Sequence, residues 1–224
     1  MLPAPLPQAI LSVIKVDGHF YAVPIDHMPG WIWYSKAAFK KAGIVAEPAT
    51  VDQLFAALDK LKAAGLIALA HGGQPWQEHL IFMRMLADVG GKDLYLTVLR
   101  ERDQRAIGSA AFRKVLLAFK RMQSYVDPGA PRRNWNDATA LLIAGKAGVQ
   151  IMGDWAKGEL TAAHQLPGRD YGCLPVCSDL DGRSLDACTQ AGMASMKDKA
   201  RQVGFGEVDL TPDQNGAPFD LLTA

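Results

Sequence analysis

Two tryptophans, Trp135 and Trp155, each stand beside a carboxylate at the end of an expected structural element. Trp135 lies in an Asn-Trp-Asn-Asp stretch that ends at Asp137, and Trp155 directly follows Gly153 and Asp154. The C–H face of a sugar ring stacks on an indole, while its hydroxyls require planar donors and acceptors such as amides and carboxylates. The segment 134–159 therefore has the residue types of a carbohydrate-binding surface.

A third stretch repeats this arrangement. Residues 72–77 read Gly-Gly-Gln-Pro-Trp-Gln, so that Gln74 and Trp76 follow an expected buried strand at the start of a helix. The stretch lacks the Lys-Ser/Thr pair of a phosphate-binding loop. The alternative is structural: a glycine turn with a helix-capping role.

The elements that must position these residues alternate along the chain. We expect a hairpin from 10 to 25 turning at Asp17-Gly18, because Asp-Gly is a strong hairpin signal. Further strands are expected at 31–34, 66–70, 149–152 and 170–174. Helices are expected at 35–42, 50–65, 75–89, 93–100, from 109, at 137–144 and at 155–164. Alternation of helices and strands with short connections predicts a three-layer α/β domain.

Trp155 has a favourable place in such a fold. Ligands of α/β domains bind beyond the carboxyl ends of strands, and Trp155 comes directly after the strand 149–152. Gly153 would permit a sharp turn or a close approach, and Asp154 would face a helix N-terminus. The alternative is that Trp155 belongs to the core and that Asp154 only caps a helix.

Composition excludes several classes of function. The chain has 224 residues and a net charge of +1, which gives no electrostatic reason to expect nucleic acid or an anionic membrane as a partner. No apolar run is long enough to span a bilayer, and the N-terminus lacks signal-peptide features, so the chain as written is expected in the cytoplasm. Three cysteines, Cys173, Cys177 and Cys188, are expected as buried or free thiols rather than a disulfide or metal site.

Enzyme signatures are absent. The sequence contains no Gly-x-Ser-x-Gly elbow, no His-Glu-x-x-His motif and no Gly-x-Gly-x-x-Gly after a strand. Asp137 and Asp154 could form the carboxylate pair of a glycosidase, but each also has an explanation as a cap or ligand contact. A metal site at His71, Glu78 and His79 would need residue 71 to be helical, which Gly72-Gly73 contradicts. No cofactor is expected.

Taken in order, the motifs resemble the glucose/mannose-binding proteins of bacterial ABC sugar importers, a branch of the maltose-binding-like, family 1 extracellular solute-binding proteins. The resemblance covers about residues 10–176. The matching stretches are Asp-Gly-His-Phe-Tyr-Ala-Val-Pro (17–24), Trp-Ile-Trp-Tyr (31–34) leading to Phe-Lys-Lys-Ala-Gly (39–43), Gly-Gly-Gln-Pro-Trp-Gln (72–77), Asn-Trp-Asn-Asp-Ala (134–138) and Ile-Met-Gly-Asp-Trp-Ala-Lys-Gly-Glu (151–159).

The resemblance implies a type II periplasmic-binding-protein lobe and a non-enzymatic function. In the family, two lobes close over a sugar and the closed form docks on a membrane permease, outside the cytoplasm. Trp135 and Trp155 would pack against a bound hexose. The other implied site residues are Trp76, Gln74, Asp154, Lys157, His27 and, beside Trp135, Asp137.

The sequence also departs from the family. Members are nearly twice as long, and Met28 and Thr189-Gln190 stand where the family has Arg and Asp-Ser. We therefore expect a chain truncated at both ends: a remnant of the first lobe with a hinge-crossing strand (1–30), a near-complete second lobe (31–176) and a returning segment with a divergent, irregular tail (177–224).

Three hypotheses follow from this organisation. The first is a half-site that binds a glucose- or mannose-type monosaccharide weakly. The second is an enzyme that acts on glycosides through Asp137 and Asp154, and the third is a remnant that binds no sugar. In each case exposed strand edges predict self-association.

Overall fold

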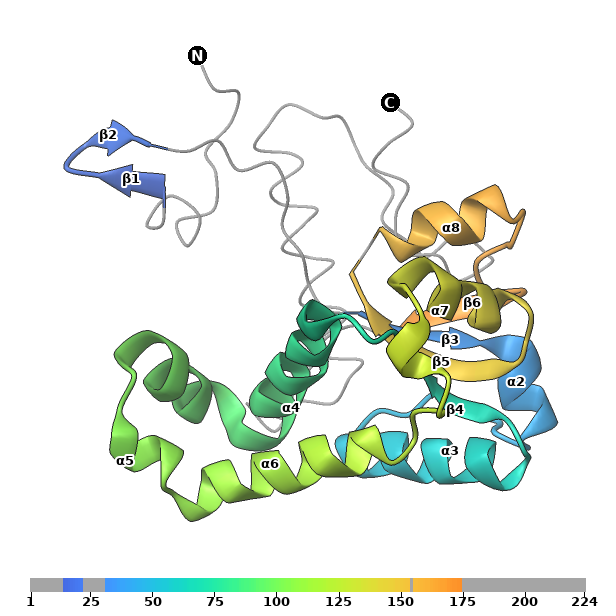
Figure 1. Ribbon diagram of the computed structural model, residues 1–224, viewed down its shortest axis with the longest axis horizontal. Helices are drawn as coiled ribbons and strands as arrows, with labels where there is room; N and C mark the ends of the chain where they lie inside the picture. The colour runs from blue at the N-terminus through green and yellow to red at the C-terminus, as the bar shows by residue number, and fades with distance from the viewer. Residues whose placement is uncertain (1–13, 22–30, 154, 175–224) are drawn as a thin grey trace.

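The computed structural model describes residues 14–21, 31–153 and 155–174 (Figure 1). Two expected site residues, His27 and Asp154, lie outside the described residues. So do Cys177, Cys188 and the whole of the segment 177–224.

A four-stranded mixed sheet lies at the centre. Its strands are β3 (Trp31–Ser35), β4 (Ile67–Ala70), β5 (Ala147–Met152) and β6 (Tyr171–Leu174), in the order β4-β5-β3-β6. The pair β4 and β5 is parallel, whereas β3 is antiparallel to both β5 and β6. Since β4 and β5 run in the same direction, their carboxyl ends, where residues 71–77 and 153–155 begin, meet at one edge of the sheet.

Side chains alternate across the sheet with period two. On β3, Ile32 and Tyr34 enter the larger core, whereas Trp33 enters a second core on the other face. On β5, Ile151 belongs to the first core and Met152 to the second. Both faces of the sheet are thus buried, which confirms the expected three-layer α/β architecture.

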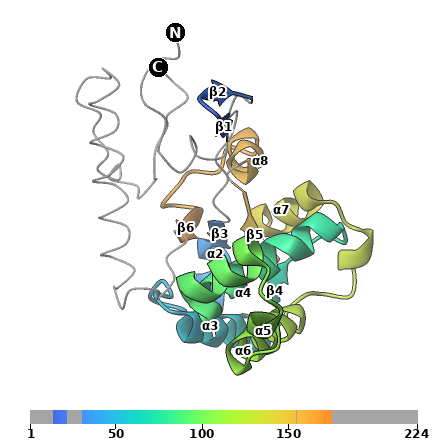
Figure 2. The same ribbon diagram turned by 90° about the vertical axis from the view of Figure 1, so that its left-hand side faces the viewer.

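The helices form the outer layers. One layer contains α3 (Val51–Ala63), α4 (Pro75–Leu96) and α6 (Ala110–Gln123), whose fully buried side chains include Leu58, Leu61, Met85, Leu86 and Met122. The other contains α7 (Trp135–Ile143) and α8 (Ala156–Ala162). Figures 1 and 2 both show α3 and α6 below the sheet and α7 and α8 above it. The short helix α2 (Lys36–Lys41) follows β3.

Several expected helix starts are confirmed by their caps. The hydroxyls of Ser35, Thr50 and Ser109 accept hydrogen bonds from the backbone N–H groups of Ala38, Gln53 and Phe112. These hydroxyls satisfy N–H groups that have no partner inside the helix. The expected Asp17-Gly18 turn is also confirmed, since both residues have positive φ between β1 (Lys15–Val16) and β2 (His19–Phe20).

The helix expected at 75–89 is interrupted where expected. The element α4 runs to Leu96, but Gly91 has a non-helical backbone with φ of 84°, so two helical segments meet there at a kink. A Cβ on Gly90 would lie 3.1 Å from Val115 Cγ2, so this glycine permits close packing of α4 on α6. The helix expected at 93–100 follows this kink: its first part is the last segment of α4, and its second part is the π-helical turn η1 (Thr97–Glu101).

Smaller differences concern element boundaries. The helix expected at 137–144 begins at Trp135, with Asn134 as its N-cap. The strand expected at 149–152 begins at Ala147, and the helix expected to reach His164 ends at Ala162. His164 itself adopts a left-handed conformation with φ of 55°, which terminates the helix. The remaining elements are α5 (Gln104–Ile107) and η2 (Ala130–Arg132), and no described helix is long and apolar enough to cross a membrane.

Candidate functional site

Three tryptophans from three helix starts meet at the carboxyl ends of β4 and β5. Trp76 is the second residue of α4, Trp135 the first of α7, and Trp155 the N-cap of α8. The Trp155 ring centroid lies 6.0 Å from that of Trp76 and 6.3 Å from that of Trp135, with interplanar angles of 60° and 81°. We call this group the tryptophan cluster. The sequence placed each member at an element boundary, and the structure brings all three together.

Trp155 rests directly on Gly153. A Cβ on Gly153 would lie 2.5 Å from Cε3 of the Trp155 indole, so only glycine leaves room for the ring. The end of β5 is held from the other side, because Trp33 Nε1 donates to the carbonyl oxygens of Met152 and Gly153 at 3.2 Å each. The expected close approach at Gly153 is therefore made by an indole of the chain itself.

Gln74 joins the starts of α4 and α7. Its side-chain oxygen accepts the backbone N–H of Trp135 at 3.3 Å and the amide of Gln77 at 2.9 Å. Gln77 is fully buried, and its own side-chain oxygen accepts the N–H of Gly72 at 3.0 Å. The side-chain oxygen of Gln74 thus connects the two helix starts, and Gln74 contacts the backbone of Trp135.

Two buried polar side chains bind the backbone carbonyl of Trp135. Gln150 Nε2, from β5, donates to the carbonyl oxygen of Trp135 at 3.1 Å, and the hydroxyl of Thr139 lies 3.1 Å from the same oxygen. Both side chains are completely buried. Buried polar groups are costly unless they are paired, so these hydrogen bonds hold the backbone of Trp135 in a fixed position relative to β5.

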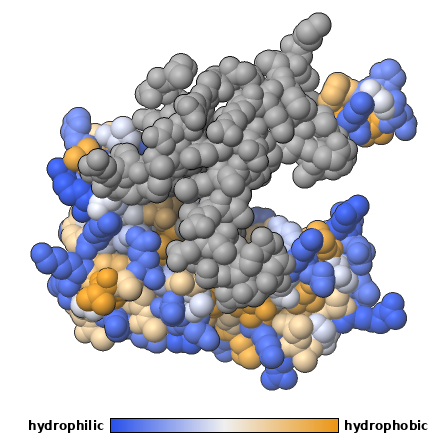
Figure 3. Space-filling view, turned by 180° about the vertical axis from the view of Figure 1, so that it is seen from behind, coloured by the Kyte–Doolittle hydropathy of each residue, from blue (hydrophilic) through white to orange (hydrophobic). Residues whose placement is uncertain are grey.

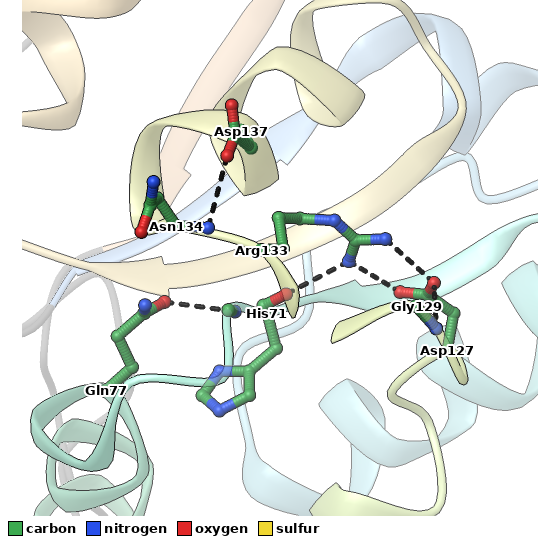
Figure 4. A network of polar contacts seen from close by, with 8 residues as sticks. His71, Gln77, Asp127, Gly129, Arg133, Asn134 and Asp137 are labelled. Carbon is green, nitrogen blue, oxygen red and sulfur yellow. Dashed lines mark hydrogen bonds and ion pairs between the residues drawn. The ribbon is translucent and has the colours of Figure 1, made fainter. Parts of the chain in front are cut away.

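Arg133 links the loop after β4 to the loop before α7 (Figure 4). Its guanidinium binds both carboxylate oxygens of Asp127, at 2.7 and 2.8 Å, and also donates to the carbonyl oxygen of His71 at 3.0 Å. In return, the N–H of Gly73 donates to the carbonyl oxygen of Arg133 at 3.0 Å. We call this set of contacts the arginine latch. It sets the distance between the segments that carry Trp76 and Trp135.

The ion pair of the arginine latch shifts the pKa of both of its residues. Hydrogen bonds from Arg133 hold the pKa of Asp127 below its ordinary value, although partial burial opposes this shift. The same contact raises the pKa of Arg133. Sequence reasoning missed this pair. The turn signal at Asp127-Pro128-Gly129 was visible in the sequence, but no spacing rule pairs a turn aspartate with an arginine beyond the turn.

The remaining expected residues that the structure describes lie outside the tryptophan cluster. Asp137 is exposed in the first turn of α7, where its carboxylate accepts the N–H of Asn134 at 3.1 Å. This contact supports the expected capping role. Lys157 is half-buried in the first turn of α8, two residues after Trp155. His71 is buried with Nε2 3.1 Å from Glu78 Oε1, and no described group of three side chains has a metal-binding arrangement.

Comparison with known proteins identifies the family. The model of the bacterial extracellular solute-binding proteins matches residues 2–182. The chain belongs to this family. Its members are solute-binding proteins rather than enzymes, so the glycoside-acting alternative is not supported.

The curated relatives agree with this assignment. A probable sugar-binding periplasmic protein of Rhizobium meliloti is 41% identical over 170 residues, which cover 75% of this chain and 41% of the relative. One from Brucella suis is 42% identical over 175 residues, covering 78% and 40%. An ABC transporter extracellular-binding protein of Pyrococcus horikoshii is 33% identical, covering 96% and 52%. The chain thus spans about two fifths to one half of the length of these relatives.

Solved structures show the same fold. The solute receptor AcbH, which has a preference for β-D-galactopyranose, superposes with a TM-score of 0.60 at 23% identity, covering 77% of this chain and 43% of that one. A chitin oligosaccharide binding protein gives 0.61 at 24% identity, covering 74% and 42%. The periplasmic-binding-protein-like fold expected from the sequence is therefore confirmed.

Proposed function

We propose that the chain binds a carbohydrate as part of the solute-binding component of an ABC importer. The observation that carries the proposal is the tryptophan cluster, which gathers Trp76, Trp135 and Trp155 at the ends of β4 and β5. Trp76 is 38% exposed and its two neighbours are partly exposed, so indole surface is open to a ligand. The side-chain NH2 groups of Gln74, near Trp76, and of Asn134, next to Trp135, can donate to hydroxyl groups, whereas the side-chain oxygen of Gln74 is already engaged within the chain.

The ligand that we propose is a single hexose of the glucose or mannose type. Two indoles near a right angle form a corner into which one pyranose ring fits, with its C–H face on one indole and its edge against the other. The cluster forms one wall of a site. The facing wall would come from another lobe, so binding to this chain alone should have a Kd of about a millimolar.

The test is a titration with glucose and mannose, followed by tryptophan fluorescence. We expect a saturable change in the wild type that Trp155→Ala abolishes. Trp31→Phe is the matched control, since it removes an indole outside the cluster and should leave the response intact. A wild type without any response, or a response that survives Trp155→Ala, would refute the proposal.

Two further assignments belong to this proposal. A membrane permease would be the partner, and the chain would lie in the periplasm or on the extracellular side, as for a solute-binding component.

Self-association through strand edges also stays a prediction. The strand β6 pairs with β3, and no described strand covers its other edge. Sedimentation would test it, and a monodisperse monomer would contradict it.

A further inference from the structure

The outward face of α6 has an unusual composition. Leu117 lies at its centre and is 57% exposed, and the residues three and four positions before and after it are all basic. These are Arg113, Lys114, Lys120 and Arg121. Residues at these spacings share one face of a helix, so the four cations surround the leucine. The opposite face buries Phe112, Val115 and Met122 in the core.

Positive charge is concentrated in α6 and the residues directly before it. Residues 97–123 contain seven basic and two acidic side chains, for a net charge of +5, in a chain whose total is +1. The whole-chain charge, which gave no reason to expect an anionic partner, conceals this asymmetry. Within the described residues, Arg113, Lys114 and Lys120 form no ion pair, whereas Arg121 binds Asp59 at 3.0 Å. Three of the four cations are therefore available to a partner.

More apolar surface adjoins the face. Leu116 is 45% exposed on its flank, and Ile107 on α5 is 39% exposed. In the space-filling view, hydrophobic and hydrophilic side chains lie next to one another along the lower edge of the molecule, the edge along which α3 and α6 run (Figure 3). Lysine and arginine stems can lie along such apolar surface while their charged ends reach outward.

We propose that this face of α6 binds the surface of an anionic lipid bilayer. A ring of cations would contact the headgroups while Leu117 enters the boundary of the acyl region. Within α6 there is no carboxylate, and Gln123 is its only amide. The face thus combines positive charge with exposed apolar surface, a combination that complements the boundary of an anionic bilayer.

The position of the face suits such a role. Figures 1 and 2 place α6 below the sheet and α7 and α8, which carry Trp135 and Trp155, above it. A chain bound to a membrane through α6 would keep the tryptophan cluster accessible to solvent. The inference does not depend on what the cluster binds.

The test is co-sedimentation of the full chain with vesicles of phosphatidylcholine, with and without phosphatidylglycerol. We expect binding only when phosphatidylglycerol is present, weakening as salt is added. The double variant Arg113→Glu/Lys120→Glu should bind at least tenfold more weakly, because each basic side chain near an anionic surface contributes roughly a factor of five. Lys40→Glu/Lys41→Glu, on α2, changes the net charge by the same amount and should bind within about twofold of the wild type.

Leu117→Gln separates a bilayer from other polyanions. It keeps every charge, so a several-fold loss of vesicle binding supports insertion into the lipid interface. Unchanged binding of Leu117→Gln, together with full competition by polyglutamate, would overturn the lipid assignment in favour of an acidic protein surface. No binding by the wild type, or equal losses in the two charge variants, would also overturn it. Circular dichroism of each variant controls for folding.

Discussion

The loops that follow β4 and β5 have similar sequences and different packing. Each leaves a parallel strand through glycine and reaches a tryptophan at a helix start. After β4, a Cβ on Gly73 would lie 2.5 Å from the Cα of Pro131, so this glycine meets another backbone. After β5, the three atoms nearest to a Cβ on Gly153 all belong to the indole of Trp155.

This difference predicts different effects of substitutions in the two loops. The loop after β4 is fixed to the segment before α7 by the arginine latch and by Gln74, so a change there disturbs the backbone. The loop after β5 holds a side chain against a strand end that Trp33 already secures. We therefore expect substitutions after β4 to affect stability and substitutions after β5 to affect ligand response.

The largest effect is expected for Gly73→Ala. Neither backbone can yield easily, so the free energy of unfolding should fall by about 3 kcal/mol. Thermal unfolding measures this. Gly158→Ala is the control, because a Cβ there meets nothing within 4 Å and alanine favours the helix by about 1 kcal/mol. Equal melting temperatures for Gly73→Ala and the wild type would show that the two backbones are not locked together.

The second-largest loss of stability is expected when the arginine latch is broken. Arg133→Met leaves the Asp127 carboxylate without its partner, and both side chains are less than one fifth exposed, so we expect a loss of about 2 kcal/mol. Urea unfolding is the measurement. Arg105→Met, at an arginine whose side chain is 94% exposed and lies 3.6 Å from Asp103, is the control and should change stability by less than about 0.5 kcal/mol.

The latch also predicts a pH dependence. Because Arg133 lowers the pKa of Asp127 in the folded chain, its stabilising contribution is present above the unfolded pKa of about 4. The contribution is lost as the pH falls through the lower, folded value. Acid unfolding of Asp127→Asn should therefore show a weaker dependence on pH below about 4 than the wild type. Parallel curves for the two proteins would contradict this.

Gly153→Ala should change stability less, by about 1 kcal/mol, because the indole of Trp155 can move away where a backbone cannot. Its main effect would be on the cluster. Coupling between the indoles gives a circular dichroism signal, which should diminish together with any response to sugar. A variant with unchanged signal and response would show that the ring position does not depend on Gly153.

The variant Trp76→Ala tests the ligand more than the fold. Trp76 is the most exposed member of the cluster but still buries more than half of its surface, so its removal should cost about 2 kcal/mol. The response to sugar should also weaken. If Trp76→Ala and the wild type respond equally, Trp76 lies outside the ligand's reach and the cluster reduces to Trp135 and Trp155.

Local chemistry explains what the sequence could predict. Caps such as Ser109 and turns such as Asp17-Gly18 are properties of neighbouring residues, so they are readable without the fold. The convergence of three tryptophans was partly readable, because each followed a strand or began a helix. The arginine latch was not, because it joins a turn aspartate to a carbonyl on a different strand end. The break in α4 at Gly91 was readable, because the sequence predicted separate helices at 75–89 and 93–100 with two glycines between them.

The place of β3 in the sheet has a consequence for biosynthesis. This strand emerges early, yet it lies between β5 and β6, and Trp33 donates to Met152, 119 positions further along the chain. Until those residues leave the ribosome, the apolar side chains of β3 have no sheet to join. Such distant pairing slows folding and prolongs the time in which an unpaired strand can aggregate. The nascent chain should therefore depend on protection by chaperones until β6 has been synthesised.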